Sequence, residues 1–330
     1  MNQDDNKNTV TEENQTPIIN VAPSPHLVGS AGSTQQMMLD VLIALIPVVA
    51  SSIYFFRVYA IKQLLICIAG CMITEAVFTR MRGKSMPLSD LSALVTGVIL
   101  GLSLPGTAPW YIPLIASVTA IGIGKTVFGG IGMNIFNPAM VGRAFVMIAF
   151  SAALAASGYE TASSGISILT KATPLTAFQQ SDIITPLSTL FWGAYNGSLG
   201  ETNALACILG GLYLCIRRTA SWEIPAGMIG IAILMGSLSS FSNVESGWTP
   251  LHHLFGGALL FGAFFIATDP VTSPLTPKGK LIFGAGVGFI TMVLRLFSGY
   301  PEGVMFAVLF MNALTPLINR WTIPRPLGKA

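Results

Sequence analysis

The side chains of this sequence that are most suggestive of chemistry are hydroxyls in one polar stretch, Thr170-Lys171-Ala172-Thr173. The stretch lies in the longest interval without an apolar run, residues 158–201. A threonine hydroxyl is a weak nucleophile unless a base lies beside it, and no neighbour in the stretch supplies one. Judged by its residues alone, the stretch is a polar turn that ends at Pro174.

Two further turns carry unusual residues. Residues 128–138 (FGGIGMNIFNP) are rich in glycine, which permits close backbone approach, but they lack the lysine of a phosphate-binding loop. They are either a cofactor cradle or a re-entrant packing turn, and the residues favour the latter. Residues 267–279 (ATDPVTSPLTPKG) hold three prolines. There Asp269 could cap a helix, bind a cation or pair with Lys278, and a rigid connector explains the segment equally well.

The remaining ionisable and sulfur-containing residues indicate no metal site, and among them Glu75 and Arg143 are the candidates for a functional site or an internal pair. Cys67 and Cys71 are one helical turn apart, but two thiols are too few to hold a metal and are typical of a packed core. Asp40 and Asp90 fall where helices should start, and a helix N-terminus favours anions. Glu75 and Arg143 lie deeper in apolar segments, which predicts a site or an internal ion pair. His252-His253 lacks the third ligand of a metal site.

The composition requires that these residues be positioned by membrane helices. Of 330 residues, 52% are hydrophobic and only 9% are charged, whereas a soluble domain carries about 25% charge. We predict an all-α polytopic membrane protein without a cleaved signal peptide and without a nucleic-acid partner. Residues 1–36 are polar and rich in Asn, Gln, Thr, Ser and Pro, which predicts a flexible N-terminal tail.

Hydropathy predicts ten spans, each near the length of about 20 residues that crosses the hydrocarbon layer. Several are short, so some are expected to be tilted or broken. The predicted spans cover residues 38–56, 63–78, 91–104, 110–127, 139–156, 202–216, 224–240, 251–268, 281–297 and 304–318.

The positions of the basic residues predict the orientation of these spans. With the N-terminus in the cytoplasm, the outer loops hold only Arg57, Lys62 and Lys171. The inner loops and the C-terminal tail then hold Arg80, Arg82, Lys84, Arg217, Arg218, Lys278, Lys280, Arg320, Arg325 and Lys329. Because positive residues are enriched on the inner side, both termini are predicted to be cytoplasmic and residues 158–201 to lie outside.

Five predicted spans precede the interval 158–201 and five follow it. The two halves, residues 37–157 and 202–330, share a faint pattern. Pro105 and Pro270 follow corresponding spans, and the Asn-Pro at 137–138 resembles the segment 312–316, which is expected to interrupt the last span. We therefore predict a five-plus-five inverted repeat.

Several segments of the chain are specific when taken together: SPH (24–26), MLDV (38–41), NIFNPAMVG (134–142), ATDPVTSPLT (267–276), LIFGAG (281–286), GYPEGV (299–304) and MNA (311–313). With these segments the chain resembles one family, the D subunits of the Rnf complex, and more distantly the B subunits of the sodium-pumping NADH:quinone reductase. The resemblance covers nearly everything after the N-terminal tail.

The resemblance implies a covalent flavin. In that family FMN is joined through its phosphate to the last threonine of a Ser/Thr-Gly-Ala-Thr motif in an outer loop, by a separate flavin transferase. Here the motif reads Thr170-Lys171-Ala172-Thr173. Thr173 is the implied attachment residue, and Lys171 replaces the family glycine, where it could help to neutralise the phosphate. A non-covalent riboflavin is a further implied cofactor, and the turns with Asn137, Asp269 and Thr272 are the implied walls of a ligand site or ion path.

The resemblance also implies a function and partners. The Rnf complex passes electrons between ferredoxin and NAD and moves Na⁺ or H⁺ across a bacterial or archaeal cell membrane. This chain would be an electron carrier, with other Rnf subunits as partners, especially a single-span subunit with a second covalent flavin. It would not react with NAD or ferredoxin itself.

Two other interpretations remain open. A passive channel or solute transporter suits an inverted repeat with broken helices and would carry no flavin. A scaffold subunit that has lost its flavin site is the other, since Lys171 departs from the family motif.

Overall fold

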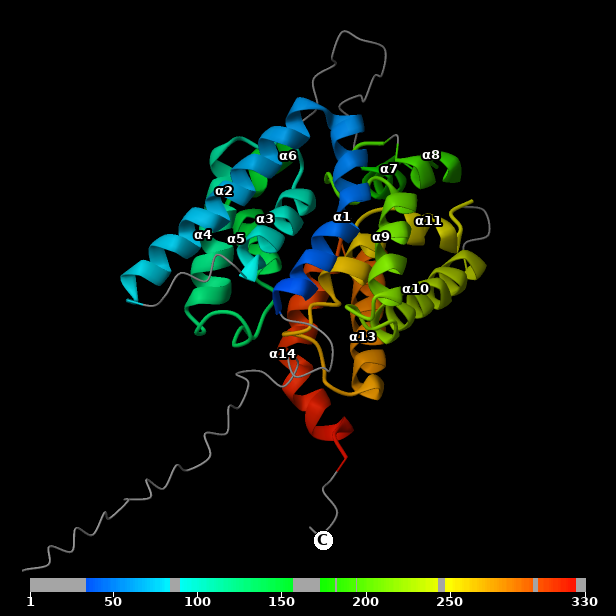
Figure 1. Cartoon of the computed structure of the whole chain (residues 1–330). Coiled ribbons are helices and arrows are strands. Elements are labelled where there is room, and N and C mark those ends of the chain that lie inside the picture. The colour runs from blue at the N-terminus through cyan, green and yellow to red at the C-terminus, as the bar shows by residue number, and fades with distance from the viewer. Residues whose placement is uncertain are drawn as a thin grey trace, which may run out of the picture.

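The computed structural model describes residues 34–83, 90–156, 173–181, 183–193, 195–242, 247–298 and 302–324. Every regular element within these residues is a helix (Figure 1), so the all-α prediction is confirmed for this part of the chain. Three of the four predicted cofactor-site residues, Thr170, Lys171 and Ala172, lie outside it.

The helices fall into two classes by length. Five are long and apolar enough to cross a membrane: α1 (Thr34–Phe56), α2 (Val58–Met81), α10 (Glu223–Ser242), α13 (Pro277–Phe297) and α14 (Val304–Thr322). Shorter apolar helices are α3 (Ser92–Ser103), α4 (Tyr111–Ile121) with the π-helix η3 (Gly122–Thr126), α5 (Pro138–Ala149) and α9 (Ala204–Ile216). The shortest are α6 (Ser151–Ala156), α7 (Pro174–Ser181), α8 (Leu187–Trp192), α11 (Pro250–Phe255), α12 (Leu259–Phe261) and the π-helix η5 (Gly262–Ile266).

Each predicted span contains helix, but two predictions about continuity need correction. The span predicted at 251–268 is divided into α11, α12 and η5, with Gly257 at a positive φ of 70° between the first two. Conversely, α14 runs without a break through Asn312 and Pro316. A proline inside a membrane helix is tolerated where neighbouring groups satisfy the freed carbonyl. The interval 158–201 also contains α7 and α8, where the sequence had predicted only loop.

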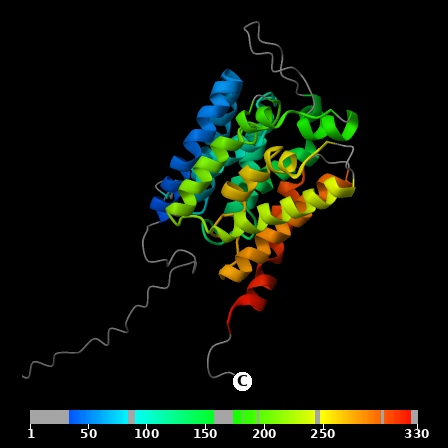
Figure 2. The same cartoon turned by 90° about the vertical axis from the view of Figure 1, so that its right-hand side faces the viewer.

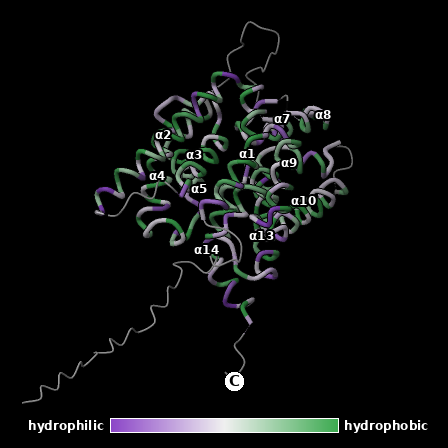
Figure 3. Tube along the Cα trace, viewed as in Figure 1, coloured by the Kyte–Doolittle hydropathy of each residue, from purple (hydrophilic) through white to green (hydrophobic). Residues whose placement is uncertain are grey.

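Polar and apolar residues are distributed as a membrane protein requires. In Figure 3 most of each long helix is coloured as hydrophobic, and large side chains such as Ile46, Leu65 and Phe310 are exposed on helix surfaces. The end of α2, the start of α13 and the end of α14 lie on the lower side of Figure 1, opposite α7 and α8. Arg80, Lys280 and Arg320 belong to those lower ends.

Helix packing follows the same order in the two halves of the chain. In the first half α2 packs on α3 and α4, and α4 packs on α5. In the second half α10 packs on α11 and α13, and α13 packs on α14. The halves meet where α1 lies against α9 and where α5 lies against α14.

Glycines allow the closest of these helix crossings. A Cβ at Gly288 of α13 would lie 2.6 Å from the Met228 carbonyl oxygen of α10, and Figure 2 shows α10 (yellow-green) crossing α13 (orange). Where α1 meets α9, a Cβ at Gly210 would overlap the carbonyl oxygen of Ala44 and lie 2.8 Å from the Phe265 ring. Small residues at such contacts let helix backbones approach within a membrane.

We therefore expect Gly210→Ala to lower the stability of the folded protein, because the obstructing atom is backbone and cannot rotate away. Overpacking of this kind costs about 1–3 kcal/mol, which is measurable as a lower Tm in detergent. Gly230→Ala on α10 is the matched control, since no atom lies within 4 Å of its added Cβ. Equal Tm values for the two variants would show that α1 and α9 are not held at this crossing.

Candidate functional site

Thr173 lies at the beginning of α7, with its side chain half-buried. Its Oγ1 is 2.9 Å from the Thr176 Oγ1 and accepts the Thr176 backbone N–H at 3.4 Å. This is the arrangement of an N-cap, and proline at the first helical position, here Pro174, has a backbone angle suited to starting a helix. The Thr173 hydroxyl is therefore placed at the positive end of a helix dipole.

Three side chains fix α7 to the rest of the protein. Leu175 is buried, Gln179 donates from Nε2 to the Arg295 carbonyl oxygen at 2.7 Å, and Phe178 stacks on Trp248 with ring centroids 4.2 Å apart. Trp248 is itself buried and lies 4.8 Å from the His252 ring. These contacts hold the helix that carries Thr173 in one position.

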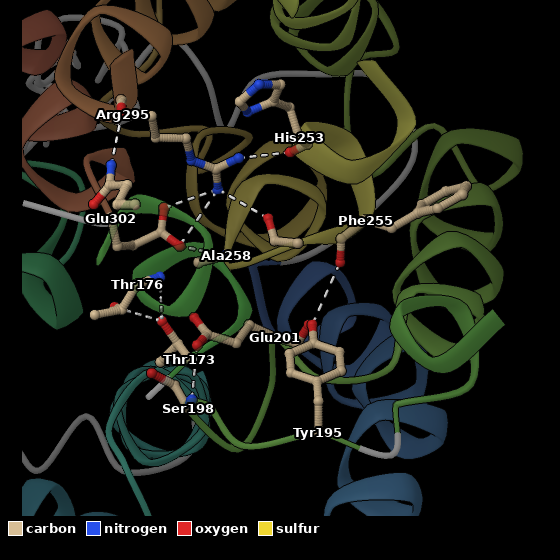
Figure 4. Close-up of polar contacts among 12 residues, drawn as sticks. Thr173, Thr176, Tyr195, Ser198, Glu201, His253, Phe255, Ala258, Arg295 and Glu302 are labelled. Carbon is tan, nitrogen blue, oxygen red and sulfur yellow. Dashed lines mark hydrogen bonds and ion pairs between the residues drawn. The ribbon is translucent and has the colours of Figure 1, made fainter. Parts of the chain in front are cut away.

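A buried arginine, Arg295, lies close to α7, and its carbonyl oxygen is the acceptor for Gln179 (Figure 4). The Arg295 guanidinium donates to the carbonyl oxygens of His253 at 2.5 Å and Gly256 at 3.0 Å, and to Glu302 Oε1 at 3.1 Å. Glu302 Oε2 accepts the Ala258 N–H at 2.7 Å. The pair thus connects the end of α13, the segment just before α14 and the loop between α11 and α12.

A second buried acid, Glu201, lies in the same region. Its Oε1 accepts the Ser198 N–H at 2.7 Å, and its carbonyl oxygen accepts the Tyr195 hydroxyl at 2.8 Å. Burial and the nearby Glu302 carboxylate raise the pKa of Glu201 to about 7, against the opposing effect of Arg143. Burial also raises the pKa of Tyr195 well above its usual value, so its hydroxyl stays protonated.

Sequence reasoning did not assign a role to Arg295, Glu302 or Glu201. A signal was present for Arg295, because a charged residue inside an apolar span needs a partner. Glu302 belongs to the segment GYPEGV at 299–304, which the sequence analysis used only as a sign of resemblance. Glu201 ends the polar interval, and nothing in its neighbours indicates that it is buried.

The other predicted site residues, Asn137, Asp269 and Thr272, form a second polar cluster. The Asn137 N–H donates to Asn312 Oδ1 at 3.1 Å, and Asn312 Nδ2 donates to the Thr272 carbonyl oxygen at 3.2 Å. The Thr272 hydroxyl donates to Asp269 Oδ2 at 3.1 Å, and the Val271 N–H donates to Oδ1 at 3.2 Å. Burial raises the pKa of Asp269, and these two hydrogen bonds oppose the shift.

Asn137 and Asp269 line a cavity of about 90 Å³ between the two halves of the chain. Its wall also includes Ser92, Lys125 and Thr219, whereas Thr272 does not line it. Asp269 thus caps its own turn and faces a cavity, and no ion pair joins it to Lys278 among the described residues.

The structure shows which groups interact with three of the charged residues that the sequence places in or near apolar spans. Glu75 forms a buried ion pair with Lys125 of η3, whose Nζ also donates to Ser92 Oγ at 2.5 Å. The charge of Arg143 acts on Glu201. For Asp40, the prediction that a helix N-terminus alone explains its charge needs correction. Its carboxylate accepts hydrogen bonds from Thr219 Oγ1 at 2.9 Å and Arg217 at 3.3 Å.

Comparison with known proteins agrees with this description. Residues 20–328 match the model of the NQR2, RnfD, RnfE family. The chain is 38% identical over 322 residues to the D subunit of a proton-translocating ferredoxin:NAD(+) oxidoreductase complex from Clostridium ljungdahlii, covering 94% of this chain and 96% of that protein. It is 39% identical over 315 residues to the D subunit of the Na(+)-translocating complex from Acetobacterium woodii, covering 94% and 95%. It is 40% identical over 333 residues to the D subunit of an ion-translocating oxidoreductase complex from Stutzerimonas stutzeri, covering 90% and 93%.

The docking of α7 can be tested through Gln179. We expect Gln179→Ala to loosen α7, because it removes the hydrogen bond to the Arg295 carbonyl oxygen. Loss of one such bond costs about 0.5–1.5 kcal/mol, so the α7 amides should exchange hydrogen roughly three- to tenfold faster in mass spectrometry. Ser188→Ala in α8, at an exposed residue, should leave the exchange of α7 unchanged. Equal exchange rates in the wild type and Gln179→Ala would contradict the docking.

Proposed function

The chain belongs to the NQR2, RnfD, RnfE family, and from this premise we propose that it is the D subunit of an ion-translocating ferredoxin:NAD⁺ oxidoreductase. We propose further that it carries electrons within the membrane through FMN joined to Thr173. The ion is Na⁺ or H⁺, since the names of two similar relatives differ on this point. The protein itself does not react with NAD or ferredoxin.

The observation that supports the flavin assignment is the position of the Thr173 hydroxyl. A phosphoester at this oxygen would lie at the N-terminus of α7, where backbone N–H groups such as that of Thr176 favour a negative charge. The docked helix would hold the attached group at a fixed place, and Lys171 of the same motif would help to neutralise its phosphate. When bound, FMN supplies reversible electron transfer; the chain supplies attachment, orientation and an electrostatic environment.

The non-covalent riboflavin that the resemblance implies does not fit the inner cavity in the shape that the structure shows. The cavity measures about 90 Å³, whereas a cavity that holds benzene measures roughly 150 Å³. A three-ring flavin would require Asn134, Phe265 and other lining residues to move apart. We therefore assign no riboflavin to this cavity.

We also propose the five-plus-five inverted repeat, with both termini cytoplasmic and residues 158–201 outside. The repeated packing order of α2–α5 and α10–α14 supports the repeat. The basic residues at the ends of α2 and α14 and the start of α13 support the orientation, because all three ends lie on one side of the molecule (Figure 1). This orientation places Thr173 on the outer face of a bacterial or archaeal cell membrane.

The proposed partners are ones that could reach Thr173 on the outer face of the membrane. We propose that Thr173-bound FMN exchanges electrons with other members of the complex, especially a single-span subunit that carries a second covalent flavin outside. A flavin transferase would make the phosphoester, so the chain itself would not need a base to activate the Thr173 hydroxyl, whose hydrogen bonds among the described residues are with Thr176.

A passive channel or solute transporter is the second candidate, and the cavity between the halves, whose wall includes Lys125 and Asp269, favours it. Such a protein would need no docked helix for a cofactor. The presence of a covalent flavin separates the two functions.

The flavin assignment predicts that the full-length protein, purified from a host with the flavin transferase, gives a fluorescent band on a denaturing gel. Thr173→Ala should abolish the fluorescence, because it removes the side-chain oxygen through which the proposed phosphoester forms. Thr176→Ala is the matched control, since it removes the neighbouring hydroxyl 2.9 Å away and should leave the band bright. A dark wild-type band, or a bright Thr173→Ala band, would refute the attachment.

The ion-path assignment predicts that Asp269→Asn lowers ion transport by the complex in vesicles. The substitution removes the negative charge of a half-buried side chain that lines the cavity. Asparagine can still accept the Val271 N–H at Oδ1, and its Nδ2 can donate to the Thr272 hydroxyl. Electron transfer with the purified complex serves as the control for assembly. Unchanged ion transport in Asp269→Asn vesicles would remove Asp269 from the path.

A further inference from the structure

The carboxyl group of Glu201 is a buried acid that the proposed function does not use. Its Oε1 accepts one hydrogen bond, from the Ser198 N–H. Its Oε2 is buried and has no hydrogen-bond partner among the residues that the structure describes. A buried carboxylate oxygen without a partner is costly while it is charged. Oε2 is therefore the atom on which a proton would be most stable.

The groups around Glu201 leave its charge only partly compensated. Glu302 faces it from the segment just before α14, Arg143 from α5 and Arg295 from α13. Tyr195 of the same loop and Cys207 of α9 also lie nearby. Arg295 already forms its ion pair with Glu302, and no described residue forms an ion pair with Glu201.

The other nearby groups are poorly suited to exchange a proton. Both oxygens of Glu302 are bound, one by Arg295 and the other by the Ala258 N–H and Arg295. The Tyr195 hydroxyl donates to backbone carbonyls, and its pKa is raised well above the usual value. Glu201, whose pKa is raised to about 7, is the group whose protonation changes near neutral pH.

The same residues connect Glu201 to α7. A Cβ at Gly257 would lie 2.8 Å from both the Leu175 Cδ1 atom and the Arg295 Nη2 atom. Leu175 is two residues after Thr173, so the attachment residue lies close to the Arg295–Glu302 pair that faces Glu201 (Figure 4). A negative charge held near Thr173 would raise the pKa of Glu201, because a like charge nearby disfavours the ionised carboxylate.

We propose that Glu201 is a proton-exchanging group of the Thr173 site. When the flavin at Thr173 accepts one electron from a carrier in another subunit, the Glu201 carboxylate takes up one proton from water, forming an O–H bond at Oε2. When the electron leaves, that bond breaks and the proton returns to water. One electron and one proton enter together, so the charge of the site is unchanged. This inference rests on the proposed function.

The test uses the full-length flavin-bearing protein and measures the midpoint potential of its flavin by spectroelectrochemical titration over a range of pH. An added electron raises the pKa of Glu201, so the linked proton uptake occupies a pH window that begins near 7 and extends upward. In this window the wild-type potential should fall more steeply with pH. Glu201→Gln should lose the extra slope, because glutamine still accepts the Ser198 N–H but takes up no proton, and Glu201→Asp should restore it.

Two further variants test the dependence on charge, one at a residue that faces Glu201 and one at the start of another helix. Glu302→Gln removes the negative charge that raises the pKa of Glu201, so the window should move to lower pH. Glu223→Gln, at the start of α10, should change nothing. A fluorescent protein whose slope is the same in Glu201→Gln, or whose window stays in place in Glu302→Gln, overturns the inference alone. A wild-type band without flavin overturns the proposed function and this inference together.

Discussion

The ion pair between Arg295 and Glu302 is the interaction on which the Thr173 side of the molecule depends. A buried guanidinium is expensive to desolvate and persists only where its donors find acceptors. The two terminal nitrogens of Arg295 meet this requirement with the carbonyl oxygens of His253 and Gly256 and with Glu302, whereas Nε has no hydrogen-bond partner among the described residues. The break between α11 and α12 supplies one of those carbonyls, and the Arg295 carbonyl oxygen in turn anchors α7 through Gln179. Replacing either member would leave the other charge buried without a partner.

A second constraint comes from lipid, in which a backbone group without a hydrogen bond costs several kcal/mol. Helices that end inside the molecule must therefore satisfy their free groups with side chains. Asn137 caps α5 by accepting the Met140 N–H, and its Nδ2 donates to the Ile266 carbonyl oxygen at the end of η5. Asn312, from the middle of α14, accepts the Asn137 N–H. Asn137 thus lies beside the cavity where the start of α5 meets the end of η5, and Asn312 of the continuous helix α14 binds it there.

Hydropathy predicts ten apolar segments, and the structure has helix in each of them, of which five helices are long and apolar enough to cross a membrane. It could not predict how they end. The span predicted at 251–268 is broken where Arg295, a residue distant in sequence, binds the carbonyl oxygen of Gly256. Asp40 is likewise paired with Arg217 at the end of α9, a contact that the sequence of its own helix α1 does not indicate. From the sequence alone, Pro174 indicates the end of a polar turn. In the structure Thr173 and Pro174 begin α7, and threonine followed by proline is also typical of a helix start. Pairings such as Glu75 with Lys125 depend on tertiary packing that periodicity does not encode.

Two helices run between the Thr173 site and the inner cavity. α5 begins at Asn137, which lines the cavity, and reaches Arg143, which faces Glu201, about 9 Å further along its axis. α14 begins at Val304, two residues after Glu302, and reaches Asn312, the partner of Asn137, about 12 Å further on. Both helices also pack on each other. A change of charge at Glu201 alters the electrostatic force on Arg143, in the middle of α5, and on Glu302, just before α14. The hydrogen bond between Asn137 and Asn312 joins α5 to α14 beside the turn that holds Asp269, since Asn312 also donates to the Thr272 carbonyl oxygen of that turn.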